Sequence, residues 1–119
     1  MHALIIEDEY FIVFAVEEAL RQIGFHSFAD ARSVEEAVVA ARERCPDLVV
    51  ANHHLVDGTG TDAVLAICSG QQIPVVFVTA SGSDVRCALP KAIIVNKPFG
   101  SRSLHDAVEL AQECPFVCP

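Results

Sequence analysis

The sequence centres on the stretch Pro46-Asp47-Leu48-Val49-Val50-Ala51-Asn52-His53-His54-Leu55-Val56-Asp57-Gly58-Thr59-Gly60. Its apolar run, Leu48–Ala51, follows a proline and leads into an Asp-Gly pair, which is typical of a buried strand that ends in an exposed loop. In open sheets of parallel strands, ligands bind beyond the carboxyl ends of the strands. Asn52 therefore occupies the position of a reactive side chain, although it carries only a carboxamide.

Short apolar runs and helical periodicities alternate along the rest of the chain. They predict strands at 3–6, 25–28, 48–51, 73–78 and 92–95. They predict helices at 12–23, 33–42 and 63–70, and a terminal helix that begins at Ser101 or Ser103. Only twelve residues separate Thr79 from the last strand, so a fourth helix is short or absent. The alternation predicts an α/β fold with a doubly wound, five-stranded parallel sheet.

Composition indicates one globular domain over residues 1–119, with more than half of the residues apolar. The formal net charge is -8 and no run of lysine or arginine occurs, which argues against nucleic acid or an anionic membrane as a direct partner. No apolar run reaches the roughly 18 residues of a membrane span, and the first residues do not resemble a secretory leader.

The cysteines also bear on location. Five of them, an odd number, are scattered along the chain, which suits reduced thiols and a cytoplasmic location. Cys114 and Cys118 belong to a segment, residues 114–119, that we expect to be a frayed C-terminal tail.

Polar side chains follow four of the predicted strands: Glu7 and Asp8, Asn52, Thr79, and Lys97. The topology of a doubly wound sheet brings these strand ends to one edge, so we expect the side chains to line one pocket. Acidic residues also favour the start of a helix, which is the alternative explanation for Glu7-Asp8-Glu9. The groups at the other three strand ends favour the pocket.

This combination, with Lys97-Pro98-Phe99 at the last strand, resembles the receiver domain of two-component response regulators, a flavodoxin-like fold. The resemblance covers essentially the whole chain, and the short fourth helix resembles that of small single-domain regulators. In this family an aspartate after the third strand takes a phosphoryl group from a phosphohistidine, with the help of Mg²⁺. The resemblance places this acceptor at Asn52.

The resemblance also implies roles for the other pocket residues. Mg²⁺ would be held by Glu7, Asp8, residue 52 and the backbone carbonyl of His54, because Mg²⁺ prefers hard oxygen ligands. Thr79 would offer a hydroxyl and Lys97 a cation to the transferred group.

Three departures from the family pattern change these expectations. A carboxamide is not a nucleophile toward phosphorus and brings no negative charge to the metal, so Asn52 should prevent phosphorylation and weaken the Mg²⁺ site. Ile94 stands where the family usually has an aromatic switch residue, and the fourth helix is shortened. Asn52 is either natural or an engineered change that blocks phosphorylation; the further departures favour the natural residue.

Two other features of the loop after Asn52 are candidate sites. Asp57 is the nearest substitute acceptor, but Asp-Gly is a common turn pair, which is the favoured explanation. His53 and His54 could bind a transition metal beside Asp8. Because adjacent side chains on an extended segment diverge, we interpret both as loop residues.

A partner site is predicted on the first helix. Phe11 and Phe14 fall opposite its apolar stripe, and exposed aromatic residues there would mark a contact surface. The resemblance supports this prediction, since the family docks its kinases against this helix and the loop after the fifth strand, which holds Phe99. The expected partner is a histidine kinase or a phosphotransfer protein; a homodimer is left open.

The sequence therefore predicts a stand-alone receiver in two-component signalling that acts by protein binding, independently of phosphorylation and not as an enzyme. The alternative is a conventional phosphoacceptor regulator with an engineered Asp-to-Asn change or another acceptor. A flavodoxin-like enzyme or nucleotide binder lacks support, because no glycine-rich phosphate loop follows the first strand.

Overall fold

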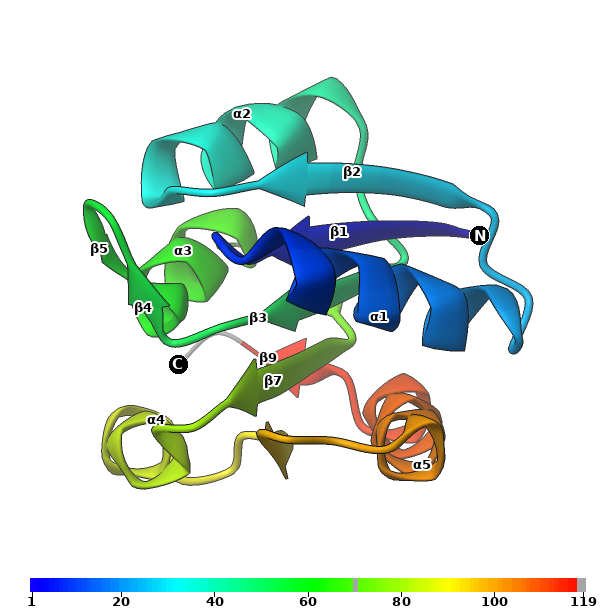
Figure 1. The fold of residues 1–119 in the computed structure, drawn as a ribbon. Helices are drawn as coiled ribbons and strands as arrows, with labels where there is room; N and C mark the ends of the chain where they lie inside the picture. Colours follow the sequence, from blue (N-terminus) through cyan, green and yellow to red (C-terminus); the bar gives the residue numbers. More distant parts are fainter. Residues whose placement is uncertain (70, 118–119) are drawn as a thin grey trace.

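Five parallel strands form the central sheet of a computed structural model that describes residues 1–69 and 71–117 (Figure 1). Across the sheet the strands are β2 (Ser27–Ala31), β1 (His2–Ile6), β3 (Leu48–Ala51), β7 (Val75–Thr79) and β8 (Ile94–Asn96). The strand order reverses direction beside β1, which creates the switch point where doubly wound sheets bind ligands. The predicted α/β architecture is confirmed.

Helices cover both faces of the sheet and enclose two apolar cores. One face carries α1 (Tyr10–Arg21) and α5 (Ser101–Glu113); the other carries α2 (Val34–Glu43), α3 (Gly60–Ile67) and α4 (Gly82–Ala88) (Figure 1). Alternate residues of each strand enter opposite cores, so that Ile5 packs toward α1 and α5 while Leu4 and Ile6 pack toward the other helices. The inner strands β3 and β7 are consequently buried on both sides, as is usual in a parallel sheet.

The predicted bounds of β3 are confirmed, but the second and last strands each begin two residues later than predicted. After α1 the chain turns at Gly24, whose φ is 105°, and the Phe25 amide donates to the Leu20 carbonyl at 3.1 Å. Phe25 therefore belongs to the turn and the core, and β2 begins only at Ser27. The Ala92 amide likewise donates to the carbonyl of Leu89 at 3.0 Å, and β8 begins only at Ile94.

The predicted strand 73–78 is divided at Pro74. Proline has no N–H to donate, and the sheet strand β7 begins after it at Val75. The residues before it form β6 (Gln72–Ile73), which pairs antiparallel with β9 (Phe116–Val117). The prediction of a frayed tail is therefore wrong for residues 116–117, while residues 118–119 lie outside the described part of the chain.

The helix starts follow local capping. The Thr59 hydroxyl accepts from the Asp62 amide, and the Asp62 carboxylate accepts from the Thr59 amide, so α3 begins at Gly60, earlier than predicted. Helix α4 is present but has only seven residues, so the expectation of a short fourth helix is confirmed. Helix α5 begins at Ser101, one of the two predicted starts, and its N-cap is Gly100.

Within the described residues, no helix is long and apolar enough to cross a membrane.

Candidate functional site

A buried carboxylate and a lysine form an ion pair at the carboxyl edge of the sheet. Glu7, the residue after β1, is 3% exposed. The Lys97 ammonium, which follows β8, donates to both Glu7 carboxylate oxygens at 3.2 Å. It also lies 3.5 Å from a carboxylate oxygen of Glu9. The predicted meeting of the first and last strand ends is therefore present in the structure.

Burial opposes the charge on Glu7. Desolvation raises the pKa of the Glu7 carboxyl above its ordinary value, although the Lys97 ammonium acts in the opposite direction. Because the folded state holds this proton more tightly than the unfolded chain, ionising Glu7 as the pH rises costs folding free energy. Glu7, Asp8 and Glu9 bring carboxylate oxygens within 4.8 Å of one another, so the cluster suits a cation with hard oxygen ligands.

Asn52 follows β3 and lies beside Glu7 in the sheet, since Ile6 and Ala51 are paired in the register. Asn52 is 8% exposed, and its backbone N–H donates to the Ile6 carbonyl at 2.8 Å. Its side-chain Nδ2 donates to the backbone carbonyl of His54 at 3.2 Å. The amide nitrogen must be the atom that faces His54, because a carbonyl can only accept. The Asn52 side chain is thus hydrogen-bonded to the loop that follows β3 and holds it closed.

The loop is also closed from its far end by Gly60. The Gly60 amide donates to the His53 carbonyl at 2.6 Å. A Cβ atom at position 60 would overlap the backbone carbonyl oxygen of Asn52, so only glycine fits there without a shift of the backbone. The sequence analysis assigned no role to Gly60, and its place after Thr59, the start of a capping box, was the available signal.

Thr79 lies at the end of β7 and is 1% exposed. Its hydroxyl oxygen accepts from the Ser81 amide at 3.0 Å, and its backbone carbonyl accepts from the Lys97 amide at 3.0 Å. Thr79 therefore holds the loop before α4 and the residue after β8 in place. In the structure its hydroxyl is turned to its own loop.

Asp57 has a structural contact of its own. Its carboxylate accepts from the backbone amides of Val34 at 2.8 Å and Glu35 at 3.3 Å, which are the first residues of α2. A carboxylate at this helix N-terminus satisfies otherwise unpaired N–H groups and favours the helix dipole. These contacts support the turn interpretation and count against Asp57 as a substitute acceptor.

The two histidines do not diverge, so that expectation is wrong. Asn52 and His53 stand between β3 and β4 (His54–Leu55), where the chain bends. The bend brings the centroids of the two imidazole rings to 4.8 Å, at an interplanar angle of 69°. The Nε2 atom of His54 is 3.0 Å from the Ser81 hydroxyl oxygen.

The predicted aromatic residues of the first helix are exposed, Phe11 by 69% and Phe14 by 65%. Tyr10, which the sequence analysis missed, is 79% exposed, and the guanidinium of Arg32 lies 5.6 Å from its ring centroid. Phe99 differs, because it is partly buried against the core between the sheet, α1 and α5. We call Tyr10, Phe11 and Phe14 the aromatic surface of α1.

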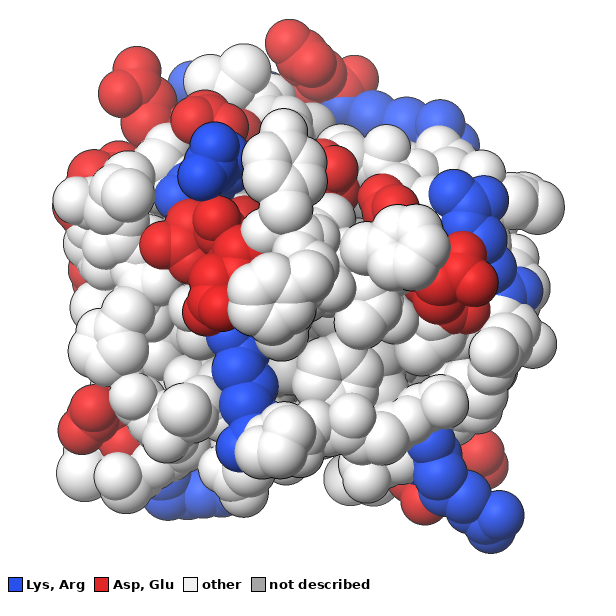
Figure 2. Space-filling view, in the orientation of Figure 1, with Lys and Arg blue, Asp and Glu red and all other residues white. Residues whose placement is uncertain are grey.

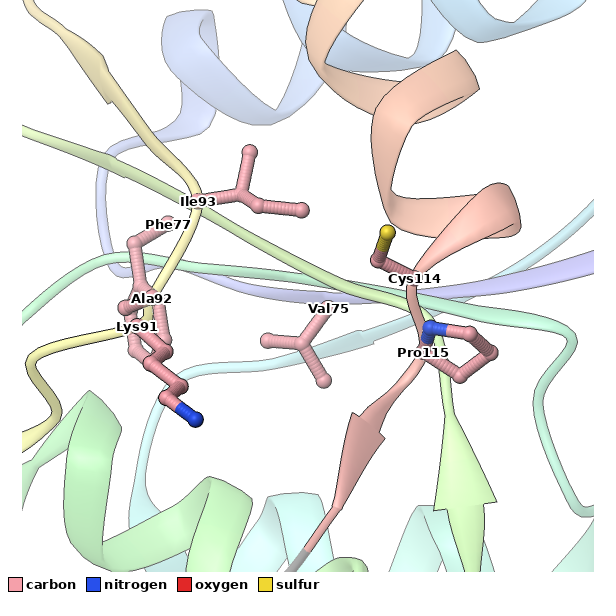
Figure 3. A pocket seen from close by; sticks show the side chains of 7 residues that line it. All are labelled: Val75, Phe77, Lys91, Ala92, Ile93, Cys114 and Pro115. Carbon is pink, nitrogen blue, oxygen red and sulfur yellow. The ribbon is translucent and has the colours of Figure 1, made fainter.

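Two further features of the surface are its distribution of charge and a cavity. On the face shown in Figure 2, basic side chains are interspersed with acidic ones and form no extended basic patch. A cavity of about 300 Å³ lies near the start of β7, between the segment before β8 and the end of α5 (Figure 3). It is lined by Val75, Phe77, Lys91, Ala92, Ile93, Cys114 and Pro115. The cavity is therefore separate from the polar groups at the carboxyl edge.

Comparison with known proteins identifies the family. The sequence model of the protein family described as the response regulator receiver domain matches residues 3–109. The transcriptional regulatory protein PdtaR of Mycobacterium tuberculosis is 37% identical over 113 residues, which cover 91% of this chain and 55% of PdtaR. The regulator PhyR of Methylorubrum extorquens is 38% identical over 79 residues, 65% of this chain and 30% of PhyR. This chain thus spans about half or less of these relatives.

The solved structures agree. The receiver domain of PhyR from Erythrobacter litoralis superposes with a TM-score of 0.85 at 29% identity, covering 96% of this chain and 91% of that domain. PhyR from Brucella abortus superposes with a TM-score of 0.80 at 30% identity, covering 93% of this chain and 46% of that one. The relatives are regulators rather than enzymes by name. The family match and the shared fold together show that this chain belongs to the response regulator receiver domains of two-component signalling.

Proposed function

We propose that this receiver acts by binding other proteins and accepts no phosphoryl group at residue 52. The observation that carries the proposal is Asn52 itself, at the strand end where the family has its acceptor aspartate. The amide nitrogen of Asn52 is a hydrogen-bond donor engaged with His54, and the side chain offers no carboxylate to attack phosphorus. The other groups expected of an acceptor pocket, Glu7, Asp8, Thr79 and Lys97, are present in the sequence.

The retained groups are engaged with one another. Lys97, the proposed cation for a phosphoryl group, is paired with Glu7, and the Thr79 hydroxyl accepts from Ser81. In a working acceptor pocket these groups would stabilise the transferred phosphoryl group. Here they support the sheet edge and the loop before α4, which favours a role for the pocket as a rigid frame for a binding surface.

Mg²⁺ binding should be weakened rather than abolished. Receiver domains generally bind Mg²⁺ at their acidic pocket, and the carboxylates of Glu7 and Asp8 suit this ion. The other two proposed ligand positions fit less well, because residue 52 is uncharged and the His54 carbonyl already accepts from its amide. The Asn52 side chain could offer the ion only its neutral carbonyl oxygen, which is a weaker ligand for Mg²⁺ than the carboxylate of an aspartate.

The aromatic surface of α1 is the proposed contact site for a histidine kinase or a phosphotransfer protein. Large exposed aromatic residues are costly in water and are enriched where proteins bind each other. Phe99 would contribute only at the edge of this surface, since it is partly buried. A related structure, PhyR of Bartonella quintana, is described as an anti-anti-sigma factor, a name that indicates action through protein binding.

The scattered thiols support a cytoplasmic location for this chain. The net charge of -8 supports a protein rather than a nucleic acid as its direct partner.

Asn52→Asp should destabilise the protein when Mg²⁺ is absent. The substitution removes the hydrogen bond to His54 and sets a carboxylate against a carbonyl oxygen, at an expected cost of about 1–3 kcal/mol. Mg²⁺, which would be held by Glu7 and Asp8 together with the new carboxylate, should recover this loss and should stabilise the variant more than the wild type. Thermal melts of both proteins with EDTA and with Mg²⁺ measure these effects. Asn96→Asp at an exposed position is the control, and equal responses of all three proteins would contradict the prediction.

Phosphotransfer tests the proposed function directly. With the cognate kinase, radiolabelled ATP and Mg²⁺, the wild type should remain unlabelled, whereas Asn52→Asp should gain label because it restores a nucleophilic carboxylate. Asn96→Asp should behave as the wild type does. A labelled wild type, with the label lost in Asp57→Asn, would favour a substitute acceptor and overturn the proposal.

Replacing the aromatic side chains should weaken partner binding without unfolding the domain. We expect Phe11→Ser combined with Phe14→Ser to raise the Kd for the kinase or phosphotransfer protein by about tenfold or more, since buried aromatic contacts contribute strongly to interfaces. The matched control is Val39→Ser, which replaces an apolar residue on α2 that is 48% exposed. Calorimetry on the purified partner gives the values; a Kd unchanged in the double variant would remove α1 from the proposed interface.

A further inference from the structure

A second group of metal-ligating side chains lies beyond Asn52. His53 and His54 belong to the bend after β3, and Asp84 belongs to the first turn of α4. One ring nitrogen from each histidine and a carboxylate oxygen of Asp84 all lie within 4.8 Å of one another. The group shares no side chain with the cluster of Glu7, Asp8 and Glu9.

His53 supplies an independent reason to expect a ligand. It is 8% exposed, and its Nδ1 has no hydrogen-bond partner, the one such buried side-chain atom found in residues 1–69 and 71–117. A buried polar atom that lacks a partner destabilises the folded state, and almost all such atoms in folded proteins are satisfied. A bound ion would satisfy a histidine in this position.

We propose that His53, His54 and Asp84 form a binding site for a divalent transition-metal ion, with Zn²⁺ as its best fit. Imidazole nitrogen is a preferred ligand of Zn²⁺, whereas Mg²⁺ selects hard oxygen ligands. Tetrahedral Zn²⁺, with bonds of about 2.0–2.2 Å, would bring its ligand atoms closer to one another than the 4.8 Å within which these three atoms lie. His54 and Asp84 are exposed, so their side chains have room to move inward toward the buried His53.

Ser81 would orient one of the proposed ligands, His54. When His54 binds the ion through Nδ1, its Nε2 keeps the contact with the Ser81 hydroxyl at 3.0 Å. Metal-bound histidines commonly make such a second hydrogen bond, which fixes the orientation of the ring. The ion would then join the loop after Asn52 to α4 and restrain two segments on the same side of the pocket. It would give this receiver an input that does not depend on a phosphoryl group.

Calorimetric titration of the full chain with Zn²⁺, under reducing conditions and in excess Mg²⁺, tests the site. We expect one equivalent of Zn²⁺ to bind the wild type. His54→Gln and Asp84→Asn, both at exposed positions, should each weaken binding by about tenfold or more. His26→Gln and Asp106→Asn are the matched controls and should bind as the wild type does. Circular dichroism and a thermal melt of each variant confirm that it is folded.

The thiols require a separate control, because cysteine also binds Zn²⁺. A variant with Cys45, Cys87, Cys114 and Cys118 replaced by serine should retain the bound equivalent. The proposal is overturned by a wild type that binds no Zn²⁺, by binding that His54→Gln and Asp84→Asn leave unchanged, or by binding that disappears with the thiols. Co²⁺ offers a further readout, since its visible spectrum should report nitrogen and oxygen ligation in the wild type and no sulfur ligation.

Discussion

The parallel pairing of β1, β3, β7 and β8 is the constraint on which the candidate site depends. It carries the residues after these strands to one edge, where the Lys97 ammonium lies 3.2 Å from the Glu7 carboxylate although the two are far apart in sequence. Both faces of the sheet are covered by helices, so the edge is the place where polar side chains can meet a ligand. A core of this kind fixes the positions of those side chains and leaves their chemistry to the identity of each residue.

Residue 52 shows how far one atom changes that chemistry. In our proposal the acceptor carboxylate of the family would stand there, whereas the amide of Asn52 donates to the His54 carbonyl. This hydrogen bond engages the His54 carbonyl, and Gly60 packs against the Asn52 backbone from the other side. These contacts hold the loop closed from both of its ends. Burial still raises the pKa of the Glu7 carboxyl, and the Lys97 ammonium offsets this only in part.

The sequence sufficed to predict the architecture, the bounds of β3 and the convergence of Glu7 with Lys97, because hydrophobic runs and parallel topology determine them. It did not predict the turn at Phe25, the break at Pro74 or the pairing of Ile73 with Phe116, which depend on hydrogen bonds made only in the folded chain. The convergence of His53 and His54 was missed for a related reason: alternation of side chains holds for an extended strand, and the chain bends after Asn52. The exposure of Tyr10 and the partial burial of Phe99 likewise follow from tertiary packing.

The central claim is that the hydrogen bond from the Asn52 amide to the His54 carbonyl holds the loop after β3 closed. The chain contains only two asparagines, Asn52 and the exposed Asn96, so NMR spectra of their side-chain amides provide an internal control. We predict that an Nδ2 proton of Asn52 exchanges with solvent much more slowly than those of Asn96, and that Mg²⁺ at concentrations that saturate Asn52→Asp leaves the Asn52 signals in place. Exchange as rapid as that of Asn96, in the absence of Mg²⁺, would contradict the claim.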